Sequence, residues 1–303
     1  MLTDGINTSE IIQGKTIINS EVRDYIELLK PRVMSLAIFT AITGMLLVPS
    51  LPNPVLAIFS IIAIGAGAGA AGAINMWYDR DIDSLMERTK FRPLPSNKVD
   101  PSEALTLGVV LSIFSVLLLA FSANYLASTL LLLSILFYVF VYTIWLKRTT
   151  AQNIVIGGAA GALPPVIGWF AAFGEFSVFP LVLFLIIFLW TPPHFWALCL
   201  YRSDDYKRAN VPMLTVVAGK KKTRLYIFLY SLSLVSIVPL PWLLGYLGFL
   251  YLLISTLLSL FFIYYSWRTY KNIEGSAPKL FKYSILYLFL LFLLMPIDKF
   301  LLS

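Results

Sequence analysis

The sequence contains little charge, and its scarcity excludes several classes of protein. Charged residues make up 13% of the 303 residues, with 16 acidic against 23 basic ones. Soluble globular chains carry about 25% charged residues, so the composition excludes an ordinary soluble enzyme. A single cysteine, Cys199, excludes a disulfide framework. A single histidine, His194, excludes a haem site held by two histidines.

Apolar residues are what the sequence has in abundance. They make up 59% of the chain, the mean hydropathy is +0.82, and intrinsic disorder is thereby excluded. Nine apolar runs approach the roughly 20 residues that a helix needs to cross a bilayer. The runs cover residues 33–51, 54–77, 103–121, 125–145, 154–173, 178–200, 225–244, 248–266 and 283–302. None alternates with a period of two, so we predict an all-α membrane protein with nine transmembrane helices.

The basic residues are distributed unevenly between the connections. Of the 23, all but Lys299 lie before the first run or in the connections 2–3, 4–5, 6–7 and 8–9. The positive-inside rule makes that side cytoplasmic, with the N-terminus inside and the C-terminus outside. Because the start carries Asp4 and Glu10, it does not resemble a transit peptide, which favours a bacterial inner membrane. We expect a flexible cytosolic tail over 1–22 and one membrane domain over 23–303.

A concentration of acidic residues follows the second apolar run. Asn75, Asp79 and Asp83 are spaced four apart and share one face if the helix continues, with Asp81 roughly opposite. Carboxylate and amide oxygens suit Mg²⁺, which takes its remaining ligands from water and substrate phosphates. A solvated helix end balanced by neighbouring arginines is the plainer interpretation. We favour the metal site because the acids follow an apolar helix on the basic side of the membrane.

A second acidic pair, Asp204 and Asp205, lies on the same side, between the sixth and seventh runs. The two clusters can face each other across a central cavity and bind two Mg²⁺ ions and a diphosphate. Arg88 and Arg92 can hold the diphosphate with their planar guanidinium groups, although contact with anionic lipid is an alternative. Neutralising the leaving oxygens lets an allylic diphosphate ionise, and aromatic faces in a dry interior attract the resulting cation.

These motifs resemble those of the UbiA superfamily of intramembrane aromatic prenyltransferases, whose first motif has the form Asn-x-x-x-Asp-x-x-x-Asp. More narrowly, they resemble its haem O synthase branch. The resembling stretches are Lys30 to Arg32, Asn75 to Pro95, Asn153 to Pro165 with Gly168-Trp169, Thr191 to Trp196, and Asp205-Tyr206 with Pro212 to Leu214. The resemblance implies that the farnesyl group of farnesyl diphosphate is transferred to a vinyl group of haem b. Water is added, and haem O and diphosphate are released for assembly of haem-copper oxidases.

The residue pattern and the resemblance together predict three sets of site residues, of which the catalytic and metal-binding sets overlap. The catalytic set is Asn75, Asp79, Asp83, Asp205 and Tyr206. The metal ligands, for two Mg²⁺ ions, are Asn75, Asp79, Asp83, Asp204 and Asp205. The substrate-binding set is Lys30, Arg32, Arg88, Arg92, Lys147, Arg148, Asn153, His194, Trp196, Arg202 and Lys207.

Some of these residues have a second interpretation. His194 lies within an apolar run, where an ionisable residue suggests function. It can bind haem iron or a propionate, or it can be a neutral histidine bonded to a neighbouring helix. The basic residues at helix ends are either topology anchors or partners for the haem propionates; they are Lys30, Arg32, Lys147 and Arg148.

Two other functions compete with transfer to haem. A prenyltransferase acting on a quinone precursor such as 4-hydroxybenzoate would share the first motif. A transporter would use its acids to bind coupling cations, but those should lie near the bilayer midplane rather than at its edge. We expect an active site facing the cytoplasm and no nucleic-acid partner. Haem A synthase and oxidase assembly factors are the expected protein partners.

Overall fold

A computed structural model describes residues 20–302, and within them every regular element is a helix. The first elements are α1 (Val22–Leu28), α2 (Pro31–Leu46), α3 (Pro54–Tyr78), α4 (Arg80–Ser84), α5 (Pro101–Ser122), α6 (Tyr125–Leu136), the π-helix η1 (Phe137–Leu146) and α7 (Lys147–Thr149). They are followed by α8 (Asn153–Ala162), α9 (Pro164–Phe173), α10 (Phe179–Tyr201), α11 (Ser203–Arg208) and α12 (Leu214–Val217). The last are α13 (Gly219–Ile237), α14 (Leu240–Leu243), α15 (Phe249–Tyr270) and α16 (Ser276–Leu302). Most of the predicted tail, residues 1–19, lies outside the described residues.

The expected all-helical membrane architecture is confirmed for this part of the chain. In residues 20–302, eight helical segments are long and apolar enough to cross a membrane. A ninth is present if α1 and α2, which meet at a bend of 56°, count as one span. The predicted runs coincide with α2, α3, α5, α6–η1, α8–α9, α10, α13–α14, α15 and α16. The count of nine and the orientation stay predictions.

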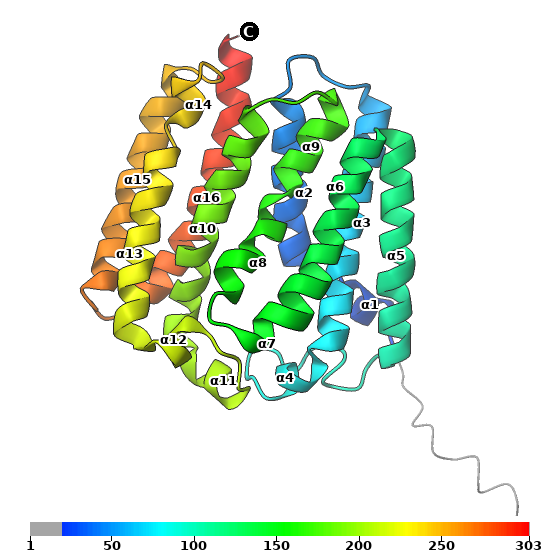
Figure 1. Ribbon diagram of the computed structural model, residues 1–303, viewed down its shortest axis with the longest axis vertical. Coiled ribbons are helices and arrows are strands. Elements are labelled where there is room, and N and C mark those ends of the chain that lie inside the picture. The colour runs from blue at the N-terminus through cyan, green and yellow to red at the C-terminus, as the bar shows by residue number, and fades with distance from the viewer. Residues whose placement is uncertain (1–19, 303) are drawn as a thin grey trace, which may run out of the picture.

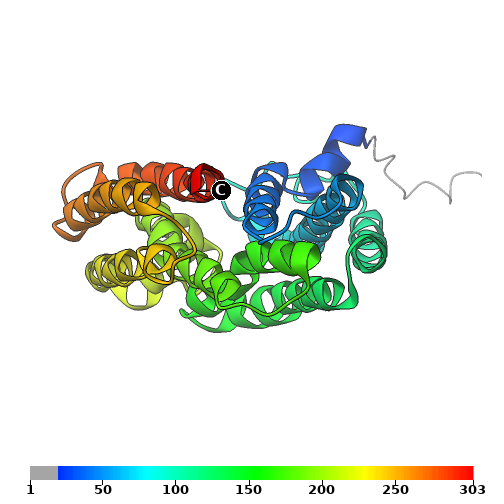
Figure 2. The same cartoon turned by 90° about the horizontal axis from the view of Figure 1, so that it is seen from above.

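The spans stand side by side, and the short polar helices gather at one end of the bundle. Figure 1 shows α4, α7, α11 and α12 together at that end, with the C-terminus at the other. Seen from above, α15 lies at one edge of the bundle and α5 at the opposite edge (Figure 2). The two acidic motifs therefore lie at the same end, as the sequence predicts, and we call it the polar end.

Two glycines bring α2 and α9 into unusually close contact. A Cβ atom on Gly44 would lie 2.0 Å from the Pro165 carbonyl oxygen, and one on Gly168 would lie 2.1 Å from that of Ala41. Only glycine allows this approach. The span that contains α9 is interrupted at Leu163, directly before Pro164, because proline at the first turn starts a new helix.

The apolar core runs through the interior of the bundle, where Trp196, Phe262 and Phe292 are buried. A smaller cluster packs α1 against α3 and the connection that follows α4. It contains Leu28, Met76, Leu94 and Val99. This cluster fixes the long loop that carries the arginines of the first motif.

Candidate active site

The first acidic motif continues helically across a break. Helix α3 ends at Tyr78, yet the Asp79 amide donates to the Asn75 carbonyl at 2.9 Å and the Asp83 amide to the Asp79 carbonyl at 2.8 Å. Asn75, Asp79 and Asp83 are 3%, 0% and 1% exposed, whereas Asp81 is on the surface. The prediction of one shared inward face, with Asp81 opposite, is confirmed.

A π-helix on the neighbouring span aligns two polar side chains with this face. The Asn75 side-chain amide donates to Thr143 Oγ1 at 2.9 Å, and Lys147 donates to Asp79 Oδ2. Both partners are 68 positions further along the chain, as expected for two parallel helices in constant register. Within η1, Thr143 donates back to the Tyr138 carbonyl at 2.8 Å, five residues earlier. Helical π segments occur frequently at functional sites.

Three cations from three separate segments contact the motif. Lys30, in the left-handed bend between α1 and α2, donates to Asn75 Oδ1. Lys147 pairs with Asp79, and Arg92 donates from the returning loop to Asp83 Oδ2 at 2.6 Å. The structure thus brings together six of the predicted residues, which come from four separate segments of the chain.

Arg148 lies 3.7 Å from Asp79 Oδ1 and makes its direct hydrogen bonds to the next turn of the motif. Its guanidinium donates to both oxygens of Asp81 at 2.7 and 2.8 Å and to the Tyr78 carbonyl at 3.0 Å. It also lies 4.5 Å from the centre of the Tyr78 ring. The hydrogen bond from Arg148 lowers the pKa of Asp81, because it stabilises the carboxylate. This contact clamps α4 to α7.

In the second motif only part of the predicted set is buried. Asp205 and Tyr206 of α11 are 7% and 3% exposed, whereas Asp204 is on the surface. Arg208 pairs with Asp205 Oδ1. Burial raises the pKa of Tyr206, so its hydroxyl keeps its proton and can donate.

The two motifs meet through the loop that follows α4. Arg88 of this loop is close enough to the Tyr206 hydroxyl to oppose part of the rise in its pKa that burial causes. The pKa of the exposed Glu87 is lowered mainly by Lys90, with a smaller contribution from Arg208 of α11. Lys30 interacts electrostatically with Asp79, Asp83, Arg92 and Lys147. The acidic motifs therefore share one end of the bundle, and the loop that follows α4 contacts both, through Arg92 at Asp83 and Arg88 at Tyr206.

The oxygen atoms of this site fit a magnesium ion. Asp79 Oδ1 and Asp205 Oδ2 are buried without a hydrogen-bond partner, so each carboxylate keeps one oxygen for another ligand. Within residues 20–302, no three His, Cys, Asp or Glu side chains form a closed metal cluster. That agrees with Mg²⁺, which uses one or two carboxylates and completes its octahedron with water and substrate phosphates.

Comparison with known proteins identifies the family. The model of the UbiA prenyltransferase family matches residues 37–293. The chain belongs to the UbiA prenyltransferase family. A protein from Afipia carboxidovorans is 56% identical over 91% of this chain and 90% of its own length. One from Rhodopseudomonas palustris (strain BisB5) is 54% identical over 97% and 96%. Both are named protoheme IX farnesyltransferase, and this chain is likewise an enzyme, a prenyltransferase.

Solved structures show the same UbiA fold. A structure of digeranylgeranylglyceryl phosphate synthase superimposes with a TM-score of 0.76 at 22% identity, covering 91% of this chain and 98% of that one. A UbiA homologue from Archaeoglobus fulgidus, bound to GPP and Mg²⁺, gives a TM-score of 0.68 at 16% identity, covering 90% and 99%.

The side chain of the single histidine, His194, contacts the neighbouring helix α16 rather than the acidic motif. His194 Nδ1 bonds to Ser284 Oγ at 2.6 Å, which ties α10 to α16. Its ring stacks between Trp190 and Phe281, with centroids at 4.2 and 4.8 Å. The geometry matches the alternative of a histidine bonded to a neighbouring helix, and contact with haem stays a prediction.

Other predicted binding residues are in the core or on the surface. Trp196 packs edge-on against Tyr230 of α13, with ring centroids 5.4 Å apart. Asn153 is buried at the start of α8 with its Oδ1 unpartnered. Four substrate-binding candidates are exposed: Arg32, Arg88, Arg202 and Lys207. Their roles stay predictions.

The sequence reasoning missed one residue that contacts the acidic motif, Thr143, and one that holds the predicted binding residue His194, Ser284. Thr143 is spaced four before Lys147, so the same helical rule that united Asn75 and Asp79 would have found it. Ser284, the partner of His194, lies in a long apolar helix and has no local signal. Its contact depends on how α10 packs against α16.

Proposed function

We propose that this enzyme transfers the farnesyl group of farnesyl diphosphate to a vinyl group of haem b and adds water, giving haem O and diphosphate. Relatives of more than 50% identity that carry the name protoheme IX farnesyltransferase support this substrate pair. The observation that carries the proposal is the buried face of Asn75, Asp79 and Asp83, contacted by cations from three other segments.

The carboxylates are proposed to hold two Mg²⁺ ions together with the diphosphate. Asp79, Asp83 and Asp205 would be ligands, and Asn75 would contribute its amide oxygen. Asp204, which is on the surface, would be a further ligand. When bound, the metal would neutralise the oxygens of the leaving diphosphate. The structure of the Archaeoglobus fulgidus homologue with GPP and Mg²⁺ supports such an arrangement.

The basic side chains of the site are proposed to bind the diphosphate itself. Lys30, Lys147 and Arg92 already lie against the motif, and Arg88 lies beside Tyr206. Each can donate to a diphosphate oxygen as negative charge builds up on it, which lowers the barrier to breaking the C1–O bond. Tyr206 donates from its hydroxyl and does not act as a base, because burial raises its pKa.

The proposed reaction proceeds in three steps: ionisation, carbon–carbon bond formation and addition of water. The C1–O bond breaks and its electron pair leaves with the diphosphate. The vinyl π electrons of haem b form the new bond to farnesyl C1, which leaves a cation beside the macrocycle. A water molecule adds through its oxygen and releases one proton. The apolar interior of the bundle protects the first cation from premature reaction with water.

The proposed setting is a bacterial inner membrane with the site facing the cytoplasm. Nine spans, with α1 and α2 as the first, would put the N-terminus inside and the C-terminus outside. The concentration of basic residues at the polar end supports this orientation. Released haem O would pass to haem A synthase or to oxidase assembly factors.

Acceptor choice tests the proposal. Purified protein with Mg²⁺, farnesyl diphosphate and haem b should form haem O, detected by mass spectrometry, and should leave 4-hydroxybenzoate unmodified. Prenylation of 4-hydroxybenzoate without any product from haem b would overturn the assignment in favour of a quinone precursor. Omission of Mg²⁺ in the presence of EDTA should stop product formation.

A further inference from the structure

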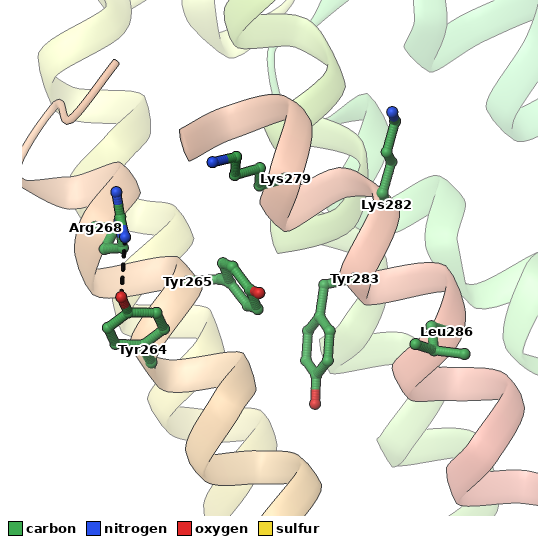
Figure 3. Close-up of a pocket in the computed structure, with 7 residues that line it drawn as sticks. All are labelled: Tyr264, Tyr265, Arg268, Lys279, Lys282, Tyr283 and Leu286. Atoms are coloured by element: carbon green, nitrogen blue, oxygen red, sulfur yellow. Dashed lines mark hydrogen bonds between the residues drawn. The ribbon is translucent and has the colours of Figure 1, made fainter. Parts of the chain in front are cut away.

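A groove of about 470 Å³ lies between α15 and α16, near the polar end. Figure 3 shows Lys279 extending from α16 toward the side of α15 that carries Arg268, with the rings of Tyr265 and Tyr283 between the two helices. All of its lining residues belong to α15 or α16, whereas the acidic site is built from α3, α4, η1, α7 and α11. The groove is therefore separate from the active site.

The groove carries positive charge that the protein leaves uncompensated. Between positions 264 and 286 the chain has four basic residues and one acidic residue, Glu274. In the described part of the chain, none of the ion pairs involves Arg268, Lys279 or Lys282. Arg268 is instead oriented by Tyr264, which accepts its hydrogen bond at 2.9 Å. An anion placed here would meet cations without competing carboxylates.

Beside the basic residues, the groove is lined first by tyrosine rings and then by aliphatic side chains. Tyr283 donates to the Leu258 carbonyl at 2.8 Å, which fixes its ring as part of the wall. Its ring lies 5.0 Å from that of Tyr265, whose hydroxyl has no hydrogen-bond partner within residues 20–302. Deeper along the spans, the outer surface consists of exposed apolar side chains such as Leu260, Phe261 and Leu286.

We propose that this groove binds an anionic phospholipid. Its phosphodiester would lie between Arg268 and Lys279, its ester oxygens would accept from Tyr265, and an acyl chain would lie over Tyr283 and Leu286. The order from cation to tyrosine to aliphatic side chain matches the order from headgroup to hydrocarbon in a leaflet. A free phosphate would leave the apolar half of the groove uncovered.

Lipid titration with native mass spectrometry tests the proposal on the full chain in detergent. The probes are phosphatidylglycerol and phosphatidylcholine with identical acyl chains, and inorganic phosphate. The test variant is Arg268→Gln with Lys279→Gln. The matched control is Lys220→Gln with Lys221→Gln, which removes two exposed charges near the polar end, outside the groove. Thermal midpoints in lipid-free detergent check that each variant is folded.

The native protein should retain one phosphatidylglycerol more tightly than phosphatidylcholine, and the test variant should bind it about 10- to 30-fold more weakly. The control should bind it as the native protein does. Tyr265→Phe should weaken binding a few-fold, because one hydroxyl donor is lost. Phosphatidylglycerol should raise the thermal midpoint of the native protein but not of the test variant.

Three results would each overturn the proposal. If both double variants bound phosphatidylglycerol equally weakly, general surface charge and not the groove would attract the lipid. Equal retention of phosphatidylglycerol and phosphatidylcholine would mean that the groove ignores headgroup charge. If inorganic phosphate raised the thermal midpoint of the native protein as much as phosphatidylglycerol does, the basic residues of the groove would bind a free anion and not a lipid. None of these results depends on prenyl transfer.

Discussion

The two ends of the bundle each bury an acidic side chain next to a basic one, but the charges have different partners. At the polar end, Asp79 meets Lys147 and keeps its Oδ1 without a hydrogen bond. At the opposite end, both oxygens of Asp298 accept from backbone amides at the start of α15, those of the N-cap residue Gly248 and of Tyr251. The adjacent Lys299 donates to the carbonyls of Leu46 and Val48 at the end of α2.

The different partners of Asp79 and Asp298 distinguish a binding site from a contact that only holds helices together. Asp298 and Lys299 satisfy helix ends whose amides and carbonyls would otherwise be unpaired in the bundle. At the polar end, side chains bind side chains, and such contacts can be exchanged for a ligand without unwinding a helix. Substitutions at the opposite end should therefore affect stability and leave turnover per folded molecule unchanged. Those at the polar end should affect turnover, and also stability where they leave a buried charge without its partner.

The largest effect is expected at the first motif. Asp79→Asn or Asp83→Asn should lower the rate of haem O formation by about a thousandfold or more, because a metal ligand is lost. The rate should be measured with saturating farnesyl diphosphate and excess Mg²⁺. Asp81→Asn is the matched control on the same helix and should keep most of the rate. Near-native turnover in Asp83→Asn would remove the ligand role.

Loss of one partner from the buried ion pair should cost stability. Lys147→Gln leaves the buried Asp79 charge with only the more distant Arg148, at 3.7 Å, which should lower the free energy of unfolding by about 3 kcal/mol. Thermal midpoints in detergent check this, and Mg²⁺ should recover part of the loss by binding the folded state. Lys90→Gln breaks an exposed pair with Glu87 and should leave the midpoint unchanged. A Lys147→Gln midpoint equal to the native one would contradict the pairing.

A smaller loss of stability is expected at the opposite end. Asp298→Ala removes both acceptors at the start of α15 and should cost about 1–2 kcal/mol. Asp298→Asn keeps one acceptor and should cost less. Turnover per folded molecule should be native in both variants. A selective loss of turnover at an unchanged midpoint would show that this end is not merely structural.

The smallest effect is expected at the π-helix. Thr143→Val preserves shape but removes the hydroxyl that accepts from Asn75, which should raise the barrier by about 1 kcal/mol, or about fivefold in rate. Thr143→Ser keeps the hydroxyl and should restore the native rate. If the Val and Ser variants were equally slow, packing rather than the hydrogen bond would be responsible.

Much of the fold and half of the site could be predicted from the sequence. The apolar runs located each span to within a few residues, except that α13 and α16 begin earlier, at Gly219 and Ser276. Both starts carry lysines, which a run of apolar residues excludes. The spacing of Asn75, Asp79 and Asp83 correctly predicted one buried face, because helical periodicity is a local property.

The cations of the site could be named from the sequence but not assigned to partners. Arg148 binds Asp81 while its neighbour Lys147 binds Asp79, and nothing in the sequence separates the two. The π-helix sets which of them faces inward. Asp204 and Asp205 look equivalent in the sequence, yet only Asp205 is buried, since α11 turns its neighbour to the surface.

Composition and periodicity alone determined that this chain is helical, spans a membrane and places two acidic motifs at one end, because these depend on residue type and local spacing. Only the tertiary structure decided which cation meets which carboxylate and which oxygens stay without a partner. At the first motif those contacts join residues 68 positions apart, and they depend on how the helices pack rather than on any local sequence pattern.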